Sequence, residues 1–103
     1  MALVIIMTTT DKLETAEKFA AELVERKLAA CVQIEPVKSL YRWQGMIQED
    51  EEFRLMIKTV MEKVTDVKEY LLNFHNYELP EFVVLQVNDS SQAYHEWVEK
   101  ETK

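Results

Sequence analysis

Residues 74–81 gather an imidazole, a phenol and two carboxylates around a bend stiffened by proline. In this segment His75 can supply a neutral imidazole nitrogen and Glu78 a carboxylate, and both groups bind divalent metal ions. Elsewhere Met7 and Cys31 can supply sulfur, which prefers copper and other soft ions. Each residue also has a structural interpretation, because a histidine can satisfy the last carbonyl groups of a helix and both sulfur residues are common in cores. Their spacing matches no metal motif, so both interpretations stay open.

Aromatic and cationic residues indicate a second kind of site. Tyr41 and Trp43 lie two apart on an extended segment, so their rings project from the same side. Lys58 follows through the turn at Gly45 and can approach that side, where a carboxylate such as Glu78 would complete an anion or small-ligand pocket. The alternative is a lysine whose hydrocarbon stem covers an aromatic patch.

The chain lacks the residues that several classes of chemistry require. Gly45 is the only glycine, so no glycine-rich loop can cradle phosphates. The chain has one cysteine and neither an HExxH pattern nor a nucleophile elbow. We therefore expect no enzyme. His95 and Glu99, four apart near the carboxyl end, could chelate an ion or form a solvated helix face.

Charge and cysteine usage limit the partners and the compartment. The formal net charge is −7, which opposes binding to nucleic acid or to anionic lipid. A lone cysteine, Cys31, cannot form an internal disulfide and favours the reducing cytoplasm. The apolar residues 1–7 are too few to span a bilayer and lack the features of a signal peptide. We expect a cytoplasmic protein with neither nucleic acid nor a membrane as partner.

Hydropathy patterns predict the elements that position these side chains. Short apolar or alternating runs predict strands, and apolar residues at helical spacing predict helices. Asp11 and Glu14 form a capping-box pattern. Pro36 is expected to stop the second strand, and Ser90 to cap the last helix. The predicted elements are a strand over residues 1–7, a helix over 11–27, a strand over 28–34 with an extended continuation over 37–43, a strand over 52–60, a helix over 64–74, a strand over 81–87 and a helix from residue 90.

This order is the split βαβ plan of ferredoxin-like folds with an added carboxyl-terminal helix. We expect an α+β fold with one antiparallel sheet, forming a single domain over residues 1–103. The first strand is apolar on both sides, whereas two helices cover only one face of such a sheet. The second face is therefore expected to meet other sheets in an oligomer. The alternative is that the last helix folds back over it.

Four segments resemble the CutA divalent-ion tolerance family. They are residues 23–34 (LVERKLAACVQI), 39–45 (SLYRWQG), 57–59 (IKT) and 75–81 (HNYELPE), and their order and spacing match from Leu3 to Trp97. The resemblance implies a ferredoxin-like homotrimer with sheets packed edge to edge and a cleft between neighbouring subunits. It also implies tolerance of divalent metal ions, copper especially. The residues that it places near the cleft are Cys31, Tyr41, Trp43, Lys58, His75, Tyr77, Glu78 and Trp97.

Two departures from the family pattern affect metal binding. Asn76 stands where the family usually has proline, so His75 loses one constraint on its position. Met7 stands where some members have cysteine, and a thioether binds divalent ions more weakly than a thiolate.

Three functions remain. The first is a trimeric divalent-cation tolerance protein that binds copper or another divalent ion. The second is a signalling module that binds a small anion in the intersubunit cleft, by fold-level analogy with the PII proteins. The third is an enzyme using Lys58, Tyr77 and Glu78 as acid and base groups, for which the chain offers no nucleophile or cofactor motif.

Overall fold

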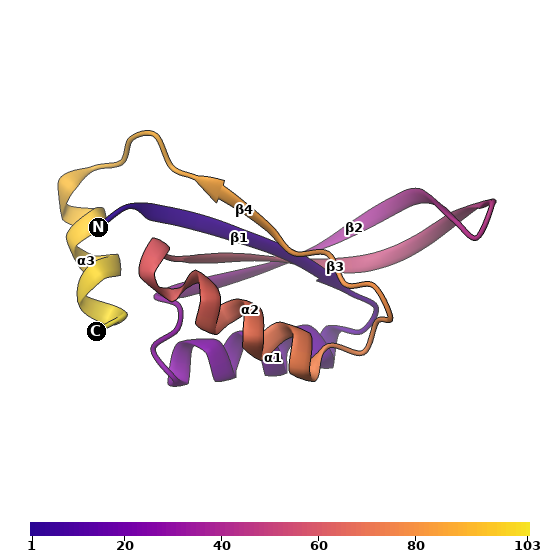
Figure 1. Cartoon of the computed structure of the whole chain (residues 1–103), viewed down its shortest axis with the longest axis horizontal. Helices are drawn as coiled ribbons and strands as arrows, with labels where there is room; N and C mark the ends of the chain where they lie inside the picture. The colour runs from indigo at the N-terminus through magenta and orange to yellow at the C-terminus, as the bar shows by residue number, and fades with distance from the viewer.

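The computed structural model describes all 103 residues and contains one four-stranded sheet with helices packed against it (Figure 1). The strands lie in the order β2-β3-β1-β4, and each neighbouring pair is antiparallel. The predicted α+β class and single antiparallel sheet are therefore confirmed. The elements are β1 (Leu3–Thr10), α1 (Leu13–Glu25), β2 (Cys31–Trp43), β3 (Met46–Val60), the 3-10 helix η1 (Met61–Lys63), α2 (Val64–Phe74), β4 (Val83–Gln86) and α3 (Gln92–Glu101).

The main core lies between one face of the sheet and helices α1 and α2, which run along the same side of it in Figure 1. Alternate residues of the two central strands supply the sheet side of this core: Val4 and Ile6 from β1, and Leu55 and Ile57 from β3. The apolar stripes of the helices supply the other side. The remaining buried members are Ala16, Phe19, Leu23, Ala29, Val67, Tyr70 and Leu71.

Two helix starts differ from the predicted caps. The N-cap residue of α1 is Lys12, and its side chain makes no capping hydrogen bond. Asp11 instead accepts a hydrogen bond from Asn76 Nδ2 at 2.8 Å, so its carboxylate ties two loops together. The cap of α3 is Ser91, one residue later than predicted, whose side chain accepts a backbone N–H of the first turn.

Helix α1 ends in a left-handed residue. Lys27 has φ 61°, and its N–H donates to the Val24 carbonyl at 3.0 Å. The next N–H, of Leu28, donates to the Leu23 carbonyl at 2.9 Å. This pair of bonds is the Schellman motif, a position where glycine is the usual residue.

The hairpin of β2 and β3 is longer than predicted. Strand β2 runs through Pro36 without interruption, and β3 begins at Met46 rather than at residue 52. Proline is tolerated because β2 is an edge strand, where not every N–H needs a ladder partner. Gln44 and Gly45 both have positive φ, 51° and 81°, which suits a tight two-residue turn. Residues 37–52, here called the hairpin arm, project beyond the helices in Figure 1.

The other face of the sheet is covered at one end only. Helix α3 packs Val98 against Leu3, Ala30 and Val60 in a small second core. The rest of this face has no covering element in one chain, and here β4 leaves Val83 40% and Leu85 45% exposed. The last helix therefore folds back over part of the apolar second face of the sheet. The other apolar residues of this face are exposed to solvent in the single subunit. None of the helices has the length and apolarity needed to cross a membrane.

Candidate functional site

Strand alternation places five of the predicted site residues on the sheet face that points away from α1 and α2. Cys31 pairs directly with Lys58, and Tyr41 and Trp43 lie at alternate positions further along β2. Met7 lies two residues from the β1 partner of Lys58, so it shares this face. One chain does not bring all five together, because ten residues of β2 separate Cys31 from Tyr41, about 33 Å along the strand.

An acidic cleft of about 750 Å³ lies where the hairpin arm meets the loop after α2. It contains four predicted residues, Tyr41, Trp43, Tyr77 and Glu78, but not Lys58. Six of its lining residues carry carboxylates and only one, Arg42, is basic, so it attracts cations. The other lining residues are Thr9, Asp11, Ser39, Asp50, Glu51, Glu52, Asn76, Leu79 and Glu81.

A partly buried hydrogen bond joins two lining residues of this acidic cleft. The Tyr77 hydroxyl donates to Glu52 Oε2 at 2.7 Å, and Glu52 is only 7% exposed. Burial and the neighbouring carboxylate raise the pKa of Tyr77 above its ordinary value. On the arm, Tyr41 donates to Asp50, and this hydrogen bond likewise raises the pKa of Tyr41. Both phenols therefore stay protonated donors at neutral pH, which suits positioning rather than proton transfer.

Both ring nitrogens of His75 are engaged by backbone groups. Nδ1 accepts the Tyr77 N–H at 3.0 Å, so the ring proton lies on Nε2, which donates to the Thr9 carbonyl at 2.8 Å. Burial lowers the pKa of His75, partly offset by its hydrogen bond to Thr9. A metal ion would have to break one of these bonds. His75 therefore positions the loop that carries Tyr77 and Glu78.

Lys58, Cys31 and Trp97 lie at the α3 end of the sheet, and Met7 lies in the middle of β1. Lys58 Nζ lies 5.8 Å from the ring centroid of Tyr94, and the rings of Tyr94 and Trp97 are 5.6 Å apart. Cys31 and Met7 are half-buried. No three His, Cys, Asp or Glu side chains come close enough together to hold a metal ion. A single chain therefore offers no closed coordination site.

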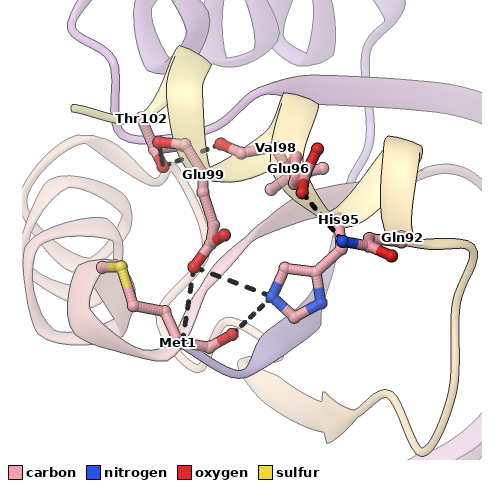
Figure 2. Close-up of polar contacts among 7 residues, drawn as sticks. All are labelled: Met1, Gln92, His95, Glu96, Val98, Glu99 and Thr102. Carbon is pink, nitrogen blue, oxygen red and sulfur yellow. Dashed lines mark hydrogen bonds and ion pairs between the residues drawn. The ribbon is translucent and has the colours of Figure 1, made fainter.

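His95 and Glu99 form a pair with the first residue rather than a separate ligand set. Figure 2 shows the imidazole of His95 and the carboxylate of Glu99 directed at Met1. His95 Nε2 lies 2.6 Å from the Met1 carbonyl oxygen, and Glu99 Oε2 lies 3.3 Å from the terminal amine. These contacts hold the start of β1 against α3.

Sequence reasoning missed most of the carboxylates in the acidic cleft. Asp50, Glu51 and Glu52 belong to an acidic run, residues 49–52, which carries no sign of burial. Only the fold shows that Glu52 meets the loop after α2, because this contact joins residues 25 apart in the chain. No local sequence signal marks this contact.

Comparison with known proteins agrees with the earlier resemblance. The family model described as CutA1 divalent ion tolerance protein matches residues 4–101. The divalent-cation tolerance protein CutA of Thermus thermophilus is 37% identical over 99 residues, which cover 95% of this chain and 96% of that protein. CutA from Synechococcus elongatus has a TM-score of 0.96 at 37% identity, covering 99% of this chain and 91% of that one.

Two more solved structures extend the comparison. CutA from Archaeoglobus fulgidus has a TM-score of 0.96 at 33% identity, covering 98% of this chain and 99% of that one. A second Synechococcus elongatus CutA structure, complexed with a Bis-Tris molecule, has a TM-score of 0.91 at 36% identity and covers 98% of this chain and 95% of that one. With the sequence, the fold and the family match in agreement, the chain belongs to the family of CutA1 divalent ion tolerance proteins.

Proposed function

We propose that this protein is a non-catalytic divalent-cation tolerance protein that binds copper or another divalent cation at the acidic cleft. The observation that carries the proposal is the charge of this cleft, with six carboxylates against one guanidinium. Carboxylate oxygens ligate divalent ions, and for a given ligand set copper binds more tightly than the other first-row divalent ions. Because no three ligands converge in one chain, the expected binding is weak and reversible.

We further propose that the protein is a homotrimer and that it is located in the cytoplasm. The uncovered sheet face with Val83 and Leu85, together with the bare hairpin arm, supports assembly, because monomers rarely expose large apolar surfaces. The lone Cys31 supports a reducing compartment.

Calorimetric titration of Cu²⁺ and Zn²⁺ into metal-free protein, with a weak competing chelator, tests this proposal. Replacing Glu78→Gln together with Glu81→Gln removes two charges from the acidic cleft and is expected to weaken binding about tenfold or more. A matched control, Glu62→Gln with Glu69→Gln, removes two exposed carboxylates of η1 and α2 and should leave the affinity unchanged.

The variant His75→Gln distinguishes copper binding by the acidic cleft from copper binding by the imidazole of His75. Both nitrogens of His75 bind backbone groups, and the amide of Gln can likewise donate and accept hydrogen bonds, so this variant should keep the loop in place and keep its affinity for copper. Loss of copper binding in His75→Gln, with normal binding in the Glu78/Glu81 pair, would move the site to the imidazole. Absence of binding in every form would reject the proposal.

A second candidate is a signalling module that takes a small organic ligand in the same cleft. Its volume suits such ligands, and the Synechococcus elongatus relative is complexed with Bis-Tris, an amine that carries hydroxyl groups. The acidic lining favours a cationic ligand over the anion expected from the sequence, since Lys58 lies elsewhere. In a Trp97→Phe background, quenching of Trp43 fluorescence by Bis-Tris that persists with a chelator would support this candidate.

A further inference from the structure

A second cavity, here called the Lys58 cavity, lies at the opposite end of the sheet from the acidic cleft. It has a volume of about 150 Å³ and is bounded by β1, β3, the end of β4 and helix α3. Its walls are mostly apolar. The lining residues are Leu3, Val4, Ile5, Lys58, Thr59, Val87, Ser90, Tyr94 and Val98.

Lys58 is the only charged residue in this lining. Its ammonium group has no carboxylate partner within 4.0 Å, and the lining of the cavity supplies none. The side chain is half-buried, and its nearest aromatic partner is the ring of Tyr94, whose centroid is 5.8 Å from Nζ. The cavity therefore presents an unpaired positive charge although the chain as a whole is acidic.

The backbone that carries this charge belongs to the sheet rather than to a loop. Lys58 lies on β3 between Ile5 of β1 and Cys31 of β2, so its backbone is paired on both sides. Its hydrocarbon stem belongs to the apolar wall, and its nitrogen is the one strong donor available to a ligand. Such a pairing of one fixed polar group with apolar walls is typical of small-molecule sites.

We propose that the Lys58 cavity binds a small organic anion, namely a carboxylate carried on a compact apolar or aromatic body. The carboxylate would pair with the Lys58 ammonium, and the body would lie against Leu3, Val87 and Val98. The volume fits this class, because an apolar cavity of roughly this size holds a benzene ring. The site is separate from the acidic cleft, so it stands or falls independently of cation binding there.

Benzoate is the probe, and Trp97 is the reporter because its ring lies 5.6 Å from that of Tyr94. In the full-length, assembled protein with Trp43→Phe, sodium benzoate should change the Trp97 fluorescence in a saturable manner. Benzyl alcohol, which keeps the ring without the charge, should bind at least tenfold more weakly. Benzylammonium, which reverses the charge, should not compete with benzoate.

Matched lysine variants test whether the ammonium group of Lys58 binds the carboxylate of benzoate. Lys58→Met keeps the stem but removes the ammonium, and it should weaken benzoate binding by at least tenfold. Lys68→Met is the control, because Lys68 also lies 5.8 Å over an aromatic ring, that of Phe82, but outside the cavity. Val87→Phe should block the cavity without changing the charge.

Equal benzoate affinity in Lys58→Met and the parent protein would overturn the proposal. So would the absence of a saturable signal, or competition by benzylammonium. Circular dichroism and the native mass of each variant verify that the fold and assembly are intact before binding is compared.

Discussion

At the scale of single residues, the loop after α2 is held by two side chains whose polar atoms are satisfied. His75 bridges the Thr9 carbonyl and the Tyr77 N–H, while Tyr77 supports the buried carboxylate of Glu52. The imidazole therefore has a structural task in its neutral form. His75 does not line the acidic cleft, so its protonation is expected to affect the cleft only through this loop.

Protonation of His75 is expected to destabilise the fold. Burial lowers the folded pKa below the unfolded value of about 6.5, so the unfolded state takes up the proton first. The contribution of His75 is complete above that value and is lost as the pH falls through it. Denaturant unfolding at pH 7.5 and 5.0 should show this loss, and His75→Gln should reduce it. An equal pH dependence in His75→Gln and the parent protein would contradict the assignment.

Removing the Tyr77 hydroxyl tests this hydrogen bond in the acidic cleft. Tyr77→Phe leaves the carboxylate of Glu52 buried without its donor, which is expected to lower the free energy of unfolding by about 1–3 kcal/mol. Tyr41→Phe breaks a similar bond to Asp50 in an exposed position and should have a much smaller effect. Urea titration of the two variants compares them directly, and equal losses would show that burial of Glu52 is unimportant.

At the scale of elements, the sequence predicted the type and order of the strands and main helices but not all their ends. Helical and alternating patterns arise from burial, so they mark segments that contact the core. The hairpin arm lacks such contacts, which explains why β3 was expected to start six residues late. The strand was expected to stop at Pro36 because an edge position cannot be recognised from one strand alone.

The left-handed end of α1 offers a stabilising substitution. Lys27 occupies a φ of 61°, where a side chain is strained and glycine is not. Lys27→Gly is expected to raise the free energy of unfolding by about 0.5–1 kcal/mol. Lys18→Gly, in the interior of the same helix, should lower it by about 1 kcal/mol. Thermal melts that show Lys27→Gly to be as harmful as Lys18→Gly would contradict the motif.

At the scale of the whole molecule, the candidate site could be predicted only in part. The side of the sheet that carries Tyr41, Trp43 and Lys58 followed from alternation and is as expected. Their separation into an acidic cleft and a distant cavity depends on the hairpin register and on where α3 packs. Neither property is visible in local sequence patterns, since both involve contacts between distant segments.

Assembly through the uncovered sheet face can be tested with one charge. Leu85→Glu places a carboxylate on this face, where Leu85 is 45% exposed in a single chain. If the face is buried between subunits, this variant should lose the trimer, because an unpaired buried charge costs several kcal/mol. Leu72→Glu is the control, since Leu72 is 51% exposed on α2. Native mass spectrometry that finds both variants equally trimeric would exclude this interface.

The position of β1 has a consequence for synthesis of the chain. This strand precedes all other elements, yet it lies between β3 and β4 in the sheet. During synthesis, β1 has no complete partner until residue 60 has been added and β3 is finished. Its second partner, β4, is finished only at residue 86. The β2–β3 hairpin, joined by two residues, can close as soon as it emerges and then serve as the template for β1. Pauses in translation before residue 60 would prolong exposure of this strand and favour aggregation of the nascent protein.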